Sequence, residues 1–235
     1  MGERHGLRDI RTMSKAVVLL SGGLDSATTL YYAKSKGYKC HCLLFDYGQR
    51  HRREIESAKR IARMAKSEWQ IIKIKLPWKG SSLLDKKIKI PELENWRTGA
   101  LGYPTIPSTY VPGRNIIFLS FALSYAEAIG ANTIFIGANA IDYSGYPDCR
   151  PEFLRAFQKV VNTGTKGGSK LKVAAPLIEK SKKEIVKLAQ RLKVPLELTW
   201  SCYKGGKGPC GVCDSCVLRA KGFKEAGVTD PLYGR

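Results

Sequence analysis

Apolar and polar positions follow one another along the chain in blocks that predict strands and helices in turn. The run AVVLL at residues 16–20 is apolar throughout, as expected of a strand buried on both faces of a parallel sheet. Residues 53–65 instead place apolar side chains three and four positions apart, which predicts an amphipathic helix. Further strands are predicted at 39–45, 69–76, 133–136 and 173–178, and further helices at 27–35, 116–129, 151–161 and 181–192. This alternation predicts an α/β fold with a doubly wound, mainly parallel, Rossmann-like sheet.

Two stretches interrupt the regular pattern. Residues 77–112 have no steady period and contain five prolines, which is typical of a lid or binding loop, or of an interface segment. From residue 199 onward cysteines gather, and residues 222–235 read as a short irregular tail. We therefore expect three parts: a mobile N-terminal extension at 1–14, the α/β domain at 15–198, and a metal-binding C-terminal segment at 199–235.

The composition excludes several classes of protein. Of 235 residues, 43% are hydrophobic, which is enough for a sizeable core and excludes disorder as the main state. No apolar run approaches the roughly 18–20 residues that cross a bilayer. The charged start lacks the apolar core of a secretory signal, so we expect a cytoplasmic protein. Forty Lys and Arg against twenty Asp and Glu give a net charge of +20. This excess suits either a solvated basic surface or attraction of nucleic acid or polyphosphate.

The first predicted strand ends in a turn, SGGLDS at residues 21–26, that leads directly into a helix. Adjacent glycines let backbone N–H groups approach an anion, and a helix N-terminus adds partial positive charge. Ser21 and Ser26 offer hydroxyl donors, and Asp25 can orient a metal-bound phosphate. Open α/β sheets bind ligands at this end of their strands. The turn resembles the pyrophosphate loop of the N-type ATP pyrophosphatases, which attack ATP at its α-phosphate.

Other nucleotide-binding signatures are absent or out of place. No stretch of the sequence matches the Walker A pattern. Gly206, Gly208 and Gly211 match G-x-G-x-x-G literally, yet they follow no βα unit and enclose a cysteine. We expect these glycines to allow tight turns around a metal instead.

Four cysteines near the C-terminus have the spacing of a metal site. They read C-x7-C-x2-C-x2-C and are Cys202, Cys210, Cys213 and Cys216. Four thiolates with no open position favour structural Zn²⁺, with an iron–sulfur cluster as the alternative. A disulfide scaffold is excluded because the chain is long and carries no secretory signal.

Three further motifs lie where a predicted strand ends or a helix begins. They are FDYGQRH at 45–51, VPGRN at 111–115 and GANAIDYSGYPDCRP at 137–151. Together with the loop and the four cysteines they resemble the QueC family over residues 15–220. The resemblance implies an ATP-dependent ligase that converts 7-carboxy-7-deazaguanine and ammonia to 7-cyano-7-deazaguanine for queuosine or archaeosine in tRNA. An adenylated carboxylate and then an amide would be intermediates, with AMP and pyrophosphate released. It also implies Mg²⁺, a homodimer, and no stable complex with nucleic acid.

The resemblance implies the following site residues. ATP would be held by Leu19, Leu20, Ser21, Gly22, Gly23, Leu24, Asp25, Ser26, Ala27, Thr28 and Thr29, and the expected catalytic residues are Asp25, Ser26 and Arg114. Lys180 and Lys182 would contact ATP phosphates. The substrate would be bound by Tyr47, Arg114, Asn115, Asp142, Tyr143 and Asp148.

Each assignment in the substrate site has a structural alternative. Arg114 either neutralises a phosphate or carboxylate, or makes a surface ion pair. Asp142 or Asp148 either accepts from the amidine edge of a guanine-like base, or caps a turn or helix. Tyr47 and Tyr143 either stack on the base or pack in the core.

Two rival functions share parts of this pattern. A tRNA-thiolating or tRNA-ligating enzyme would use the same loop, and the charge of +20 suits RNA. Such an enzyme usually needs a catalytic cysteine pair or an RNA-binding domain, and neither is evident. We expect the spare Cys149 to serve packing. The second rival, a zinc-ribbon nucleic-acid module on an inert scaffold, leaves residues 21–26 without a purpose.

Overall fold

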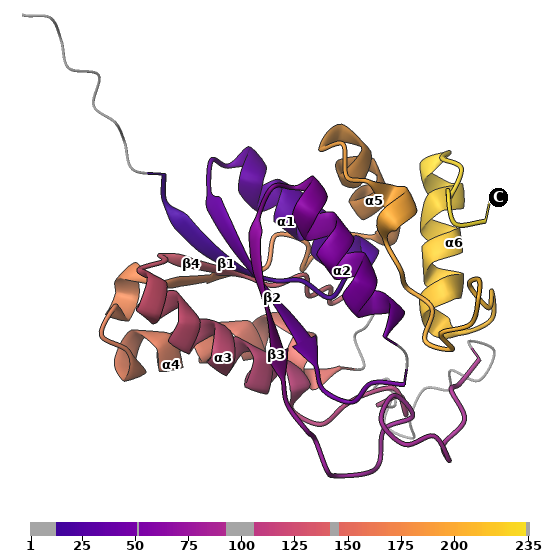
Figure 1. Ribbon diagram of the computed structural model, residues 1–235, viewed down its shortest axis with the longest axis horizontal. Helices are drawn as coiled ribbons and strands as arrows, with labels where there is room; N and C mark the ends of the chain where they lie inside the picture. Colours follow the sequence, from indigo (N-terminus) through magenta and orange to yellow (C-terminus); the bar gives the residue numbers. More distant parts are fainter. Residues whose placement is uncertain (1–12, 51, 93–105, 142–145, 234–235) are drawn as a thin grey trace, which may run out of the picture.

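A five-stranded parallel sheet forms the centre of the computed structural model, which describes residues 13–50, 52–92, 106–141 and 146–233 (Figure 1). The strands lie in the order β3-β2-β1-β4-β5. Their bounds are Lys15–Leu19 (β1), Lys39–Asp46 (β2), Glu68–Lys73 (β3), Thr133–Phe135 (β4) and Lys172–Ala174 (β5). The predicted fold class is confirmed.

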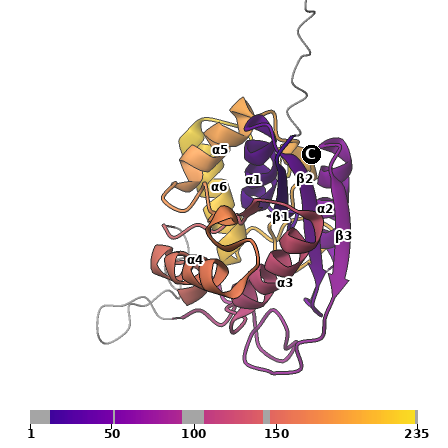
Figure 2. The same cartoon turned by 90° about the vertical axis from the view of Figure 1, so that its left-hand side faces the viewer.

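Helices cover both faces of the sheet. Figures 1 and 2 show α1, α2, α5 and α6 on one side and α3 and α4 on the other. The helices are Leu24–Ser35 (α1), Arg53–Met64 (α2), Arg114–Ile129 (α3), Pro151–Gly164 (α4), Lys182–Arg191 (α5) and Asp214–Ala226 (α6). Ser181 and Glu184 form a capping box at the start of α5, which fixes where this helix begins.

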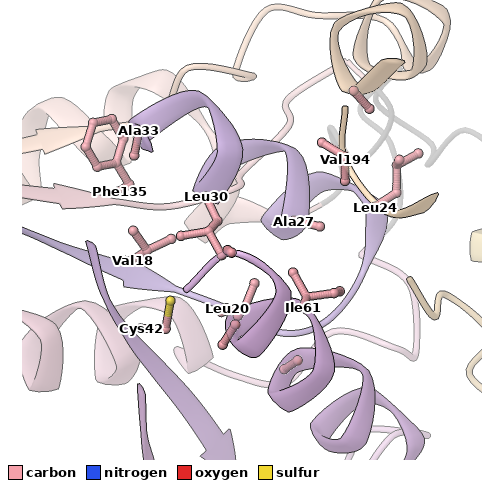
Figure 3. Packing of buried hydrophobic residues seen from close by; sticks show 14 of the residues in the cluster. Val18, Leu20, Leu24, Ala27, Leu30, Ala33, Cys42, Ile61, Phe135 and Val194 are labelled. Carbon is pink, nitrogen blue, oxygen red and sulfur yellow. The ribbon is translucent and has the colours of Figure 1, made fainter. Parts of the chain in front are cut away.

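Strand β1 supplies the core on both faces. Val18 points toward Leu30 of α1 and lies in the same cluster as Ile61 of α2, and none of these side chains is exposed (Figure 3). Val17 faces the opposite way and packs with Leu119 of α3. Because both faces are covered, the strand is apolar at every position after its exposed first residue, Lys15, which explains the continuous run AVVLL.

The strand order puts a switch point next to β1. The chain moves from β1 through β2 to β3 on one side, then returns to β4 and β5 on the other side. Loops that leave β1 and β4 therefore diverge, and the space between them at the carboxyl ends of the strands is where open α/β sheets bind ligands. The loop at residues 21–26 and Gly137 both lie there.

The C-terminal tail differs from the sequence prediction. Residues 222–235 were predicted to be irregular, but α6 extends through them to Ala226 and ends at Gly227, which adopts φ +71°. The helix forms because Cys216, Arg219 and Phe223 are buried along one face. That face carries a charged residue and cysteines rather than an apolar repeat, so hydrophobic periodicity does not reveal it.

The described parts of 77–112 pack against the α/β core. Leu83 and Val111 join the cluster on the α3 face, and the hydroxyls of Thr109 and Tyr146 are 2.6 Å apart. Glu92 makes an antiparallel bridge with Cys213. The described parts of this segment therefore contact both the α3 face of the core and the cysteine cluster. The expected N-terminal extension lies largely outside the described residues.

Candidate active site and metal centre

The loop at residues 21–26 is folded around one hydroxyl. The Oγ of Ser26 accepts hydrogen bonds from the backbone N–H groups of Ser21 and Gly22, both at 3.2 Å. The Oγ atoms of Ser21 and Ser26 are 3.0 Å apart. Gly23 is the N-cap of α1 and has no side-chain cap, so the helix N-terminus remains available to an anion.

Gly22 is fixed by two independent constraints. Its φ is +88°, and a Cβ there would lie 2.3 Å from the Glu54 carbonyl oxygen and 2.7 Å from the Ala58 nitrogen. The carbonyl of Gly22 also accepts from the N–H of Trp200 at 2.9 Å. The loop is thus packed directly on the first turns of α2 and joined to the C-terminal segment.

Gly22→Ala is expected to lower the free energy of unfolding by about 3 kcal/mol, because left-handed strain and overpacking add. Thermal and urea unfolding measure this loss. Gly37→Ala is the matched control: Gly37 has φ +83° but nothing within 4 Å of a new Cβ, so only the backbone strain of about 1 kcal/mol is expected. Equal losses in the two variants would contradict the close contact with α2.

A cavity of about 220 Å³ opens beside this loop. Of the predicted site residues, those that line it are Leu19, Leu20, Ser21, Gly23, Leu24, Asp25, Ser26, Tyr47, Arg114, Asn115 and Lys182. Those that do not are Gly22, Ala27, Thr28, Thr29 and Asp148. Asp142 and Tyr143 lie outside the described residues. The sequence therefore brings the loop and the VPGRN motif to one site.

Thr28 and Thr29 do not reach the cavity because the helix uses their hydroxyls. The Oγ1 of Thr28 donates to the Leu24 carbonyl at 2.7 Å, and that of Thr29 to the Asp25 carbonyl at 2.9 Å. Neither side chain has an exposed surface. These threonines hold the first turns of α1 rather than present donors to a ligand.

Asp25 forms an ion pair across the cavity wall with Lys182, the first residue of α5. The Lys182 Nζ lies 3.0 Å from Oδ1 and 2.9 Å from Oδ2 of Asp25. The two side chains are 10% and 21% exposed, so the pair is largely shielded from solvent. A positive charge is thereby placed at the helix N-terminus where an anion would bind. Lys180 does not line the cavity.

Tyr47 and Arg114 form another part of the cavity lining. The guanidinium of Arg114 donates to the Tyr47 hydroxyl at 3.4 Å and lies 6.0 Å from the ring centroid. Burial raises the pKa of Tyr47, so the phenol is neutral. The ring of Phe118 contacts Tyr47 edge-on at 5.4 Å and extends the apolar surface.

Asp148 has the capping role that was its structural alternative. Its Oδ2 accepts from the backbone N–H of Asn115 in the first turn of α3 at 2.9 Å. The Asn115 amide donates to the Asp148 carbonyl and, at 3.3 Å, to the Cys149 sulfur. Asp148 is buried, and burial raises its pKa against the opposing effect of that backbone hydrogen bond. The contacts hold Asn115, next to Arg114, at the cavity, whereas Asp148 itself does not line it.

Sequence reasoning missed several lining residues. Glu54 projects from the first turn of α2, and burial raises the pKa of its carboxyl to about 7. Trp200, Ser201 and Ser215 come from the C-terminal segment. Glu54 follows the FDYGQRH motif by only three positions, a proximity that could have indicated it. The residues of the C-terminal segment gave no such signal, because only tertiary packing brings them to the loop.

The four cysteines are gathered at the start of α6. All four Sγ atoms lie within 4.8 Å of one another. A tetrahedral Zn²⁺ with bonds of about 2.3 Å requires sulfurs roughly 3.8 Å apart, so the cluster fits this ion after small adjustments. Backbone N–H groups of Cys210 and Cys213 each donate to a neighbouring sulfur at 3.4 Å, which stabilises thiolates.

The metal centre and the cavity share a wall. Trp200 and Ile90 pack with the cysteines, and the Trp200 Nε1 donates to the Cys202 carbonyl at 3.0 Å. The guanidinium of Arg53 lies 4.4 Å from the Trp200 ring. Since Trp200 also lines the cavity, the cysteine cluster holds part of the site in place.

These features define a doubly wound, Rossmann-like α/β protein with a glycine-rich turn at its switch point and a four-cysteine cluster of the kind that binds zinc. A family model described as "Queuosine biosynthesis protein QueC" matches residues 15–227. The chain belongs to this family.

Curated relatives agree along nearly the whole chain. The 7-cyano-7-deazaguanine synthase of Acetivibrio thermocellus is 56% identical over 94% of this chain and 97% of that protein. The enzyme of the same name from Trichodesmium erythraeum is 52% identical over 93% and 99%. Among solved structures, the NMN synthetase from Francisella tularensis is 17% identical with a TM-score of 0.48, over 93% of this chain and 74% of that one.

Proposed function

We propose that this chain is an ATP-dependent ligase that converts 7-carboxy-7-deazaguanine and ammonia to 7-cyano-7-deazaguanine. The observation that carries the proposal is the 56% identity with a curated 7-cyano-7-deazaguanine synthase across almost the full length of both chains. The position of the cavity at the switch point of the sheet supports it. The product would serve queuosine biosynthesis, as the family description indicates, or archaeosine.

ATP would bind with its phosphates on the loop at residues 21–26. The N–H groups at the start of α1 and the Ser21 hydroxyl are donors to the phosphates, and Ser26 fixes the loop around them. Lys182 would turn from Asp25 toward a phosphate, which frees the Asp25 carboxylate to hold Mg²⁺. Charge would thus be neutralised where pyrophosphate departs.

Two activations of the same carbon account for the overall reaction. The substrate carboxylate attacks the α-phosphorus of ATP and releases pyrophosphate, which leaves an acyl adenylate. Ammonia attacks the acyl carbon, AMP departs, and a proton lost from nitrogen leaves the amide. The amide oxygen attacks a second ATP in the same way. Loss of both nitrogen protons and AMP then forms the nitrile, so each step balances with ATP as the only co-substrate besides ammonia.

The aromatic wall would receive the deazaguanine. Tyr47 and Phe118, in edge-on contact, offer an apolar aromatic surface, and Arg114 places a positive charge beside it for the substrate carboxylate. Asn115 would fix this arrangement through Asp148. We assign to Asp142 and Tyr143 the recognition of the base predicted from sequence.

Zinc would be the resident metal of Cys202, Cys210, Cys213 and Cys216 and would have a structural role. Four thiolates occupy every position of a tetrahedron, so such an ion has no open site for substrate. Its contribution would be to hold Trp200 and Ser201 against the loop. The metal-binding segment at 199–235 would therefore act as a wall of the active site.

Cysteine chemistry is disfavoured at this site. Cys149 is the cysteine outside the cluster that lines the cavity among the described residues. Burial raises its pKa to about 12, so the group is a thiol and not a nucleophilic thiolate. A tRNA-thiolating enzyme with this loop would need such a thiolate, so the observation favours the ligase.

The test is an incubation with ATP, Mg²⁺, ammonium and 7-carboxy-7-deazaguanine, read by mass spectrometry. The expected products are the nitrile and two AMP for each nitrile. AMP without nitrile would indicate that a different molecule is adenylated, and tRNA would be tested next. No ATP consumption by protein that carries its metal would contradict the proposal.

Assembly and location stay predictions. No helix within the described ranges is long and apolar enough to cross a membrane. We expect a homodimer that is located in the cytoplasm and forms no stable complex with nucleic acid. Light scattering measures the oligomeric state in solution. The charge of +20 then belongs to a solvated surface.

A further inference from the structure

Helix α6 packs on α5 through a position that tolerates no side chain. A Cβ on Gly222 would lie 2.3 Å from Cγ, 2.8 Å from Cβ and 3.1 Å from the carbonyl carbon of Lys182. Glycine costs roughly 1 kcal/mol relative to alanine inside a helix, and its φ here is not in the left-handed region. Helix geometry therefore gives no reason for glycine at this position, whereas the approach of Lys182 does.

The stem of Lys182 runs through this contact on its way to the loop. Lys182 is 9% exposed, and its Nζ lies 2.9 and 3.0 Å from the two carboxylate oxygens of Asp25. A side chain at 222 would collide with the base of the stem and not with its flexible end. The lysine would have to leave its path, or α5 and α6 would have to separate.

Gly222 lies on the same face of α6 as the residues that anchor this helix. Cys216 belongs to the metal cluster, and Arg219 makes two hydrogen bonds to Asp230, at 2.6 and 2.9 Å. Arg219 also donates to the Thr199 hydroxyl at 2.8 Å. These contacts fix the helix in height and rotation, so the glycine is held opposite the lysine stem.

We propose that Gly222 is a positioning residue for the ligase reaction: it leaves the space that lets Lys182 reach the phosphate loop at Asp25. Helix α6, which the metal centre anchors, thereby positions the ammonium of Lys182 in the proposed ATP site. This inference rests on the proposed role of Lys182 and Asp25 in ATP binding. Gly222 itself touches neither ATP nor substrate.

The experiment is a double-mutant cycle between Gly222→Ala and Lys182→Met in the full-length, zinc-loaded protein. Methionine retains the Cβ and Cγ of the stem but has no charge to place. Gly222→Ala alone is expected to lower kcat/KM for ATP about 10- to 100-fold. In the Lys182→Met background the same substitution is expected to cost less than about threefold, because coupled residues are not additive. Gly164→Ala, at the end of α4 with nothing within 4 Å, is the control and is expected to retain full activity.

Binding of a non-hydrolysable ATP analogue, measured by calorimetry across the same variants, separates this inference from the proposed function. A wild-type chain that makes no nitrile but shows the same pattern of affinities would overturn the function and support the inference. Equal losses from Gly222→Ala in both backgrounds, wild-type kcat/KM in the single variant, or loss of zinc from it would overturn the inference.

A folding defect is also informative. If Gly222→Ala is insoluble, the double variant Gly222→Ala with Lys182→Gly removes both side-chain contacts and leaves only the 3.1 Å approach to backbone. Restored solubility is the expected result and supports the steric argument. Continued insolubility would overturn it, since the glycine would then serve something other than the lysine stem.

Discussion

Lys182→Met is expected to lower kcat of the ligase by about 10²- to 10³-fold while the protein stays folded, because one charged donor is removed from a preorganised site. Methionine fills the space of the lysine stem between α5 and α6, so packing is retained. Asp25 loses its partner but is 21% exposed and can be solvated by water. Initial rates of AMP release at saturating ATP measure the effect.

Lys183→Met is the matched control for this prediction. Lys183 is the next residue of α5 but is exposed and does not line the cavity. Its replacement is expected to leave kcat unchanged within about twofold, since surface substitutions away from a site have small effects. If Lys182→Met had nearly wild-type kcat, Lys182 would have no role in the reaction and would serve only as a structural partner of Asp25.

Local signals in the sequence were enough to predict much of the fold and the loop at residues 21–26. A strand buried on both faces is a continuous apolar run, and the glycines of the loop are adjacent in the chain, so both can be found without tertiary information. The cysteines likewise show a metal site by spacing alone, since Cys210, Cys213 and Cys216 form two successive C-x2-C pairs. For these features the chain order already reflects the arrangement in space.

Contacts between distant segments could not be predicted in the same way. Asp25 and Lys182 are 157 positions apart; both were expected near the ATP phosphates, but nothing in the sequence indicates that they pair directly. Trp200 enters the cavity because the cysteine cluster holds its segment there. For Asp148 the sequence left two roles open, and only the fold shows that its carboxylate accepts from the backbone N–H of Asn115 in the first turn of α3.

The cysteine cluster gives the second large expected effect. Cys213→Ser is expected to lose the metal and lower the free energy of unfolding by several kcal/mol, because structural zinc contributes on the order of 10–16 kcal/mol in small peptides. Cys213 has no exposed surface and is the N-cap of α6, so its loss should release the helix together with Trp200. Metal analysis and thermal unfolding measure both effects, and activity is expected to disappear with the metal.

Cys40→Ala separates loss of metal from loss of a buried cysteine. Cys40 is as buried as the cluster but lies in β2, where burial raises the pKa of its thiol to about 11 and no metal site is formed among the described residues. This variant is expected to keep one zinc per chain and lose only about 1 kcal/mol. A Cys213→Ser protein that keeps its zinc would contradict the four-thiolate site. Iron and sulfide in place of zinc would identify the cluster as iron–sulfur. The wall that Trp200 forms would then depend on the redox state of the protein.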